Sequence, residues 1–306
     1  MPDHVAILMG TYQGEEFLPQ QLTSLQRQTH TNWSLWVSDD GSTDRTLDIV
    51  EQFSRKADAP VHTLEGPRRG FLPNFMALLA RPEIDADYYA FCDQDDLWHD
   101  DKIEHALAWL KAQPAARPAL FCSRTRIVDH TGAVTGFSPL FRRPPSFANA
   151  LVQSIAGGNT MVMNRAARDL IVRAGADVTV PSHDWWSYIL VSGAGGSVHY
   201  DPVPKIDYRQ HGANQVGSNS GLRARLRRIK MLKDGRFKRW SEQHIKGLEP
   251  IEPLLTPENR KLLELFQTAR SAAFPANLRA LRAAGLYRQT VPGNIGLTGA
   301  VLLRQI

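Results

Sequence analysis

The chain has 306 residues, of which 42% are hydrophobic and 22% are charged. This composition is typical of globular proteins and excludes a disordered, collagen-like or coiled-coil chain. The length suits one large α/β domain with an appendage. The two cysteines, Cys92 and Cys122, indicate neither a disulfide framework nor a thiolate metal site, which favours a reducing compartment.

Charge is distributed unevenly along the chain. Residues 1–221 contain 19 Lys and Arg against 25 Asp and Glu, whereas residues 222–306 contain 17 against 6. The stretch 223–246 carries 10 of these bases and only two acids. Such a density favours an anionic partner, for example acidic lipid, nucleic acid or an acidic protein; the alternative is the solvated face of a helix.

The sequence shows no run of eighteen apolar residues, and its start lacks the basic and apolar regions of a signal peptide. We therefore expect a cytoplasmic protein without a membrane-spanning helix.

Short apolar runs alternate with helical patterns over the first 123 residues. We expect strands at 4–9, 33–38, 61–64, 88–92 and 119–122, and helices at 17–28, 74–80 and 102–112. A further helix, with Leu47, Ile49, Val50 and Phe53 on its apolar face, follows Ser42 or Thr43 as its cap. The alternation predicts an α/β fold with a mainly parallel, Rossmann-like sheet flanked by helices.

The pattern loosens beyond residue 123. We expect a hairpin turn at 128–132, a loop at 139–145, a strand at 156–164 and helices at 222–234, 257–274 and 275–284. The polar stretch 214–221, rich in Gly, Ser and Asn, resembles a linker. It divides the chain into a catalytic domain at 1–216 and a helical, basic C-terminal extension at 217–306.

Acidic residues follow two of the predicted strands. Asp39 and Asp40 come after the second strand, and Asp93-Gln94-Asp95-Asp96 come after the strand at 88–92. Ligands of open α/β sheets bind at the carboxyl ends of the strands. Carboxylates that converge there need a cation or hydrogen-bond donors, and Mg²⁺ or Mn²⁺ bound together with phosphates would suit them. Alone, an Asp-x-Asp pattern is common in solvated loops.

Other motifs accompany these acids in a fixed order along the chain. They are Thr11-Tyr12-Gln13-Gly14, Gly70-Phe71-Leu72-Pro73-Asn74-Phe75, Asp95-Asp96-Leu97-Trp98, Gly157-Gly158-Asn159-Thr160-Met161, His183-Asp184-Trp185-Trp186 and Tyr208-Arg209-Gln210-His211-Gly212. Over residues 4–216 the set resembles the family 2 glycosyltransferases, which are inverting enzymes of the GT-A fold. The last two motifs resemble the bacterial rhamnosyltransferase branch of that family.

The resemblance implies a donor site for a nucleotide sugar. Thr11 and Tyr12 would line the nucleotide pocket, with Tyr12 against the base. Asp40, and with it Asp39, would accept a hydrogen bond from the imide N–H of uracil or thymine, which favours a UDP- or dTDP-sugar. Asp93 would contact the ribose. The alternative for Asp39 is a turn or helix-capping role.

The resemblance also implies a metal-dependent enzyme. Asp95 would bind Mn²⁺ or Mg²⁺ at the diphosphate. His211 and Arg209 lie in a segment that would close over the diphosphate, with His211 as a metal ligand and Arg209 as a donor to phosphate oxygens. A surface loop is the alternative for both residues.

The motif at 183–186 would carry the base. An inverting transfer is a single displacement that needs one carboxylate beside the acceptor hydroxyl, and Asp184 would take that proton. His183 would orient Asp184 or cap the helix. Trp185 and Trp186 would offer apolar faces to sugar rings, or else fill the core beneath a helix.

Gly158 and Asn159 complete the acceptor site that the resemblance implies. The glycines of this segment would let the backbone approach the acceptor closely.

These expectations describe an enzyme that moves a sugar, rhamnose by resemblance, from a dTDP or UDP donor to a glycan or lipid-linked acceptor in cell-surface polysaccharide assembly. Residues 222–246 would contact the inner face of the membrane. The alternatives are an inactive GT-A scaffold, a protein that binds an anionic partner through its basic tail, and a nucleotidyltransferase, whose usual basic phosphate loop is missing from residues 10–14. We expect no nucleic-acid partner, because the main domain is acidic.

Overall fold

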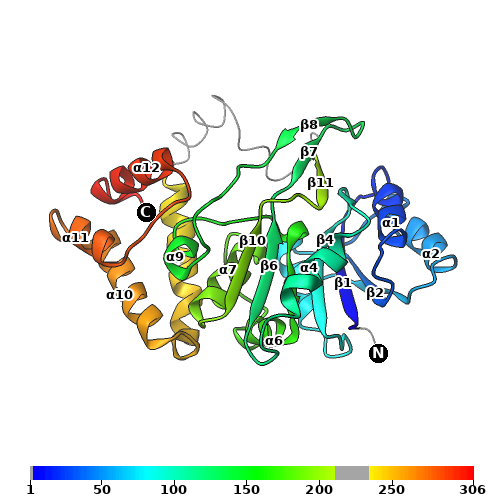
Figure 1. The fold of residues 1–306 in the computed structure, drawn as a ribbon, viewed down its shortest axis with the longest axis horizontal. Coiled ribbons are helices and arrows are strands. Elements are labelled where there is room, and N and C mark those ends of the chain that lie inside the picture. The colour runs from blue at the N-terminus through cyan, green and yellow to red at the C-terminus, as the bar shows by residue number, and fades with distance from the viewer. Residues whose placement is uncertain (1–2, 211–233) are drawn as a thin grey trace.

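The computed structural model describes residues 3–210 and 234–306. A central sheet lies between two layers of helices, and the C-terminal helices form a group beside it (Figure 1). The sheet has seven strands in the order β10-β6-β9-β4-β1-β2-β3. Their bounds are β1 Val5–Thr11, β2 Trp33–Asp39, β3 Val61–Glu65, β4 Tyr88–Asp93, β6 Ala119–Ser123, β9 Val162–Asn164 and β10 Ser197–Asp201.

The sheet is mixed but mostly parallel, as the sequence predicts. β1 pairs in parallel with both β2 and β4. The pairs β2–β3 and β6–β10 are parallel as well. β9 is antiparallel to its neighbours β4 and β6. In the register Gly10 faces Asp93 and Thr11 faces Asp39, so the acidic ends of β2 and β4 lie on either side of the end of β1.

The strands are apolar because both faces of the sheet are covered. Val5, Ile7 and Met9 of β1 belong to one hydrophobic cluster, and Ala6 and Leu8 belong to the other, since alternate side chains of a strand point to opposite faces. The first face is covered by α1 Leu18–Gln26, α2 Thr46–Ser54 and α4 Lys102–Leu110. The second face is covered by α3 Phe71–Leu79, α5 Phe147–Ala150, α6 Arg165–Arg173 and α7 His183–Gly193.

A second, four-stranded sheet has the order β5-β11-β7-β8. Its strands are β5 Leu97–Trp98, β7 Arg126–Val128, β8 Val134–Phe137 and β11 Ile206–Arg209. The hairpin of β7 and β8 confirms the turn expected at 128–132, and Gly132 adopts a positive φ of 91° there. β5 follows the acidic motif directly and pairs with β11, which brings the end of β11 next to that motif.

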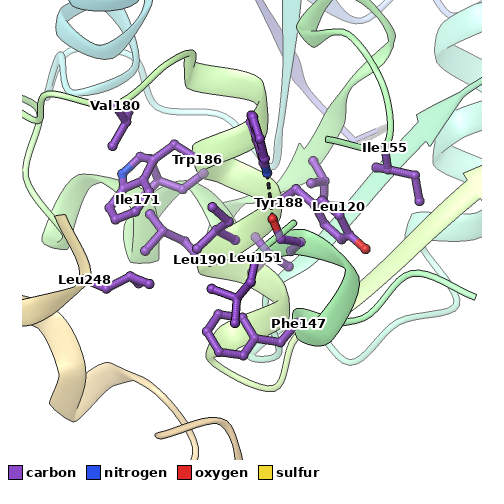
Figure 2. Packing of buried hydrophobic residues seen from close by; sticks show 14 of the residues in the cluster. Leu120, Phe147, Leu151, Ile155, Ile171, Val180, Trp186, Tyr188, Leu190 and Leu248 are labelled. Carbon is purple, nitrogen blue, oxygen red and sulfur yellow. Dashed lines mark hydrogen bonds between the residues drawn. The ribbon is translucent and has the colours of Figure 1, made fainter. Parts of the chain in front are cut away.

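The C-terminal helices continue the second hydrophobic cluster. They are α9 Arg236–Leu248, η2 Glu249–Leu254, α10 Pro257–Ser271, α11 Ala276–Ala283 and α12 Val291–Leu302. Leu248 lies close to Leu190 of α7, with Trp186, Ile171 and Val180 nearby (Figure 2). A Cβ on Gly247 would lie 3.0 Å from the Trp186 ring, so α9 approaches α7 very closely.

Two local predictions need correction. The strand expected at 156–164 is confined to β9, because residues Gly158–Thr160 form the short 3₁₀ helix η1. Ser42 and Thr43 do not cap α2, since their hydroxyls bond Asp39 and Gln13 instead. The carboxylate of Asp44 accepts the Thr46 N–H at the start of that helix.

The helices expected at 257–274 and 275–284 correspond to α10 and α11, whereas α9 and α12 were not expected. The segment 222–233 and the proposed boundary at 216/217 lie outside the described residues, so these stay predictions. Among the described residues, no helix is long and apolar enough to cross a membrane.

Candidate active site

Three carboxylates gather where β4 ends. Asp93, Asp95 and Asp96 each offer an oxygen, and these oxygens all lie within 4.8 Å of one another. Burial, followed by the charges of Asp95 and Asp184, raises the pKa of Asp93 to about 8. Burial, followed by the charges of Asp95 and Asp93, raises the pKa of Asp96 well above its usual value.

This donor set fits a divalent cation. Hard carboxylate oxygens are the ligands that Mg²⁺ and Mn²⁺ prefer. Because the raised pKa of Asp93 reports repulsion and poor solvation of its charged form, a bound cation would relieve both. The residues that would hold it are Asp93 and Asp95, with Asp96 behind them.

Asp96 belongs to the acidic motif but was given no role of its own from the sequence, and its carboxylate is directed into the protein. It accepts the Asn159 amide at 2.5 Å and the Arg209 backbone N–H at 3.1 Å. Asn159 is itself buried, so its amide holds the acidic motif in place instead of facing an acceptor.

Arg209 does not lie where the sequence analysis expected it. Its side chain is 1% exposed, and its guanidinium donates to the Asp95 carbonyl at 3.1 Å, the His130 carbonyl at 2.8 Å and the Gln20 side chain at 2.6 Å. The structure thus gives Arg209 a positioning role in the loop of Asp95 in place of a contact with phosphate. The expected metal ligand His211 lies outside the described residues.

Asp39 organises the turn after β2. Its four acceptor positions are filled by the Thr11 hydroxyl, the Ser42 hydroxyl and the backbone N–H groups of Gly41 and Ser42. The turn role that was the alternative for Asp39 therefore describes it, and Thr11, itself buried, supports that turn.

Among the described residues, two donors bind Asp40 and leave it spare acceptor capacity. One carboxylate oxygen accepts the Arg68 N–H at 2.6 Å and the other accepts the Gly70 N–H at 2.7 Å. Since each carboxylate oxygen can accept two hydrogen bonds, Asp40 is better suited than Asp39 to receive a donor from a ligand.

The backbone of Tyr12 is held by a residue that the sequence analysis passed over. The Gln94 side chain accepts from the Tyr12 N–H and donates to the Tyr12 carbonyl, both at 2.9 Å. The ring of Tyr12 is 58% exposed and is therefore available to stack on a flat ligand. An amide side chain can both donate to and accept from one peptide group, which is how Gln94 fixes the backbone of Tyr12.

Asp184 lies in the first turn of α7. The Ser182 hydroxyl and the Trp185 N–H both donate to its Oδ1. Since the charge of Asp184 contributes to the raised pKa of Asp93, the two carboxylates lie within electrostatic reach of each other.

His183 is buried among aromatic rings. Its ring stacks on Phe75 at 4.3 Å and meets Phe91 edge-on at 4.7 Å. Burial lowers its pKa to about 4, so it is neutral near pH 7. Neither ring nitrogen bonds a protein atom in the described part of the chain, so His183 does not orient Asp184 through a hydrogen bond there. Gly158 makes room for this ring, because a Cβ at that position would lie 2.4 Å from His183 Nε2.

The two tryptophans belong to the core. Trp185 donates from its indole to the Ala150 carbonyl at 2.6 Å and packs against Trp240, and Trp186 is 0% exposed. The core alternative stated for both residues therefore describes them, and neither ring offers a face to a sugar.

Lys102 is a further buried group that the sequence did not single out. Its ammonium lies 3.5 Å from the centroid of the Trp98 ring, and burial lowers its pKa to about 7. Cys92 and Asp96 act in the opposite direction and favour the protonated form of Lys102, which lies behind the acidic motif.

Replacing Gly158 by Ala should disturb the start of α7, where His183 lies. We expect Gly158→Ala to lower the free energy of unfolding by about 1–3 kcal/mol, because the new methyl group overlaps the His183 ring. Gly136→Ala is the matched control, since a Cβ there meets nothing within 4 Å. Urea titration of both variants measures the effect, and equal stabilities would contradict it.

Cation binding should depend on pH. The folded pKa of Asp93, about 8, exceeds its ordinary value of 3.8, so the charged carboxylate weakens the fold increasingly as pH rises through this window. A cation must displace the proton, so we expect the affinity for Mn²⁺ to rise by about tenfold per pH unit between pH 6 and 8.

The melting temperature measured with increasing Mn²⁺ at several pH values checks this prediction. Asp95→Ala should abolish the increase, whereas Asp48→Ala, which removes an exposed acid of α2, should preserve it. A response that does not vary with pH would argue against displacement of a proton.

Comparison with known proteins agrees with the fold and with the acidic site. A family model described as glycosyl transferase family 2 matches residues 6–171, more than half of the chain. A dTDP-rhamnosyl transferase, RfbG, from Shigella flexneri is 29% identical over 239 residues, covering 74% of this chain and 79% of the relative. A putative teichuronic acid biosynthesis glycosyltransferase, TuaG, from Bacillus subtilis is 29% identical over 116 residues, covering 37% of this chain and 44% of the relative.

Among solved structures, the mannosyltransferase PcManGT from Pyrobaculum calidifontis, in complex with GDP-Man and Mn²⁺, superposes with a TM-score of 0.52 at 17% identity. The match covers 98% of this chain and 85% of that one, which supports the GT-A fold. The chain is a nucleotide-sugar glycosyltransferase that belongs to family 2.

Proposed function

We propose that this enzyme transfers rhamnose, with inversion, from a dTDP-sugar or, as the alternative donor, a UDP-sugar. The acceptor is a hydroxyl of a glycan or lipid-linked glycan in cell-surface polysaccharide assembly. The carrying observation is the placement of Asp40, the acidic cluster and Asp184 around one edge of the sheet, with Tyr12 exposed beside them.

The base of the donor lies between Tyr12 and Asp40 in this proposal. The exposed ring of Tyr12 stacks on the base, and the free acceptor positions of Asp40 receive the imide N–H that uracil and thymine share. Cytosine lacks that N–H, so the pocket discriminates against CDP. Asp93 keeps its expected contact with the ribose.

The diphosphate lies over the acidic cluster. A divalent cation held by Asp93 and Asp95 would neutralise charge on the departing diphosphate. Asn159, Gln94 and the backbone of Arg209 hold the cluster and its loop in a fixed geometry, so little reorganisation is needed when the donor binds.

Asp184 is the base. Its Oδ1 is occupied by the Ser182 hydroxyl and the Trp185 N–H, and its Oδ2 takes the proton of the acceptor hydroxyl. As the acceptor oxygen forms its bond to the anomeric carbon, the bond from that carbon to the diphosphate oxygen breaks and its electron pair leaves with the nucleotide. The acceptor attacks from the face opposite the leaving group, so the configuration inverts.

The choice of rhamnose rests on the rhamnosyltransferase relative and on the motifs at 183–186 and 208–212. The polysaccharide setting rests on the relative named for teichuronic acid biosynthesis.

Nucleotide binding tests the donor site. We expect calorimetry with Mn²⁺ to show binding of dTDP and UDP, and binding of CDP at least about tenfold weaker, because cytosine lacks the N–H that thymine and uracil present to a carboxylate acceptor. Asp95→Ala should remove the dependence on Mn²⁺, and Asp40→Asn should weaken the binding of dTDP and UDP but not that of CDP. Equal affinity for dTDP, UDP and CDP would contradict base recognition by Asp40, and failure to bind any nucleotide would favour an inactive scaffold.

Substitution of Asp184 separates chemistry from donor binding. Asp184→Asn should lower the rate of sugar transfer by about 10²–10⁴-fold while leaving dTDP affinity within about twofold, because the base is lost and the donor pocket is not. Transfer of labelled dTDP-rhamnose to a bacterial lipid extract measures the rate.

Asp48→Asn is the matched control for Asp184→Asn, because Asp48 also lies in the first turn of a helix. An unchanged transfer rate in Asp184→Asn would rule out Asp184 as the base.

A further inference from the structure

Helix α12 turns an entirely apolar face towards solvent. Its exposed residues are Val291, Pro292, Ile295, Gly296 and Leu302, and Leu303 follows directly. Val291 is 74% exposed, Ile295 70% and Leu303 65%. The outward side of a helix in a globular protein normally carries polar or charged residues. This side of α12, which we name the α12 face, is not covered by any residue of 3–210 or 234–306.

Basic residues lie near the α12 face. Residues 265–306 contain five arginines and no Asp or Glu. Arg279 and Arg282 of α11 are exposed, and so is Arg304 at the end of α12. The start of α9 adds basic residues nearby, since the Arg288 guanidinium lies 5.6 Å from the Phe237 ring and Arg270 joins α10 to the Ile306 carbonyl.

A cavity of about 360 Å³ opens beside the α12 face. Its walls include Leu278, Leu281 and Leu297, and two exposed arginines, Arg143 and Arg282, line it as well. Thr298 of α12 also lines the cavity and lies seven residues from Val291, hence on the same side of the helix. The cavity therefore combines an apolar wall with two guanidinium groups next to an apolar surface.

We propose that the α12 face, with its arginines and cavity, docks on the surface of an anionic phospholipid bilayer. Ile295 and Leu303 enter the boundary between head groups and acyl chains, and Arg282 and Arg304 contact lipid phosphates. Charge complementarity favours this occupant over a second copy of the chain. A two-fold contact would set each arginine-rich patch against its own copy, which repels it.

The α12 face differs from the segment 222–246 that sequence patterning indicates. In Figure 1, α12 lies towards the same end of the molecule as β7, β8 and β11, the end at which β1 and β4 finish. If the proposed function holds, docking brings the acidic site near lipid-linked acceptors. The docking proposal can be tested without any transfer reaction.

Vesicle sedimentation of the full chain tests the proposal. One vesicle set is phosphatidylcholine alone and the other contains about one third phosphatidylglycerol. We expect binding to the anionic set only, weakened by added salt because exposed charges are screened. Ile295→Asp with Leu303→Asp should lower the partition coefficient by about tenfold or more, and Arg282→Gln with Arg304→Gln by about fivefold for each arginine.

Two control variants locate the surface. Leu47→Asp places the same charge at an exposed apolar residue of α2 and should bind like the parent chain. Arg236→Gln with Lys238→Gln and Arg239→Gln removes three of the four described basic residues of 222–246 and leaves Lys246. If this triple variant loses binding while the α12 variants retain it, the proposal is overturned.

Two further outcomes also overturn the proposal. One is equal recovery of the parent chain with both vesicle sets. The other is a concentration-dependent dimer of the parent chain that is absent in Ile295→Asp, because such a dimer would show that a second copy covers the α12 face. Light scattering, which measures molar mass in solution, detects that dimer. An unchanged melting temperature confirms that each variant is folded.

Discussion

Repulsion among buried carboxylates is the constraint around which this site is built. Asp93, Asp95 and Asp96 share a space of less than 5 Å, and two of them have strongly raised pKa values. Such a cluster survives in a folded chain only if donors fix it and positive charge lies near it. Asn159 and the Arg209 backbone provide the donors, and the Arg209 guanidinium, which donates to the Asp95 carbonyl, provides positive charge.

The same constraint explains why a second sheet is attached to the first. β5 leaves the acidic motif and pairs with β11, which ends at Arg209. From that position the guanidinium reaches the Asp95 carbonyl, the hairpin of β7 and β8 through His130, and α1 through Gln20. A single buried side chain thus joins four segments, and its charge lies next to the acidic motif. Its role is to position the loop that carries the carboxylates.

The sequence predicts the strands well where a short apolar run must be buried on both faces of the sheet. β1, β2 and β4 are apolar runs followed by acids, and parallel pairing brings those acids to one edge. It predicts individual side chains less well, because their roles depend on partners distant in the chain. From the sequence Arg209 resembles a phosphate donor, but in the structure its guanidinium is bound by three protein acceptors. Trp186 resembles a surface for a sugar ring, but α9 packs against it. No local pattern reveals Gln94 as the residue that holds Tyr12.

The C-terminal helices take part in the architecture of the catalytic edge. Asp184 begins α7, and the opposite side of α7 is covered by α9, where Trp185 packs against Trp240 and His244 and Trp186 meets Gly247. Burial lowers the pKa of His244 to about 3, so no charge enters this contact near neutral pH. A tightly packed core transmits small displacements. The position of Asp184, the proposed base, therefore depends on α9, which begins more than fifty residues later in the chain. The basic stretch 223–246, whose charge suggested a separate appendage, therefore continues into α9, and α9 packs against α7 in the core.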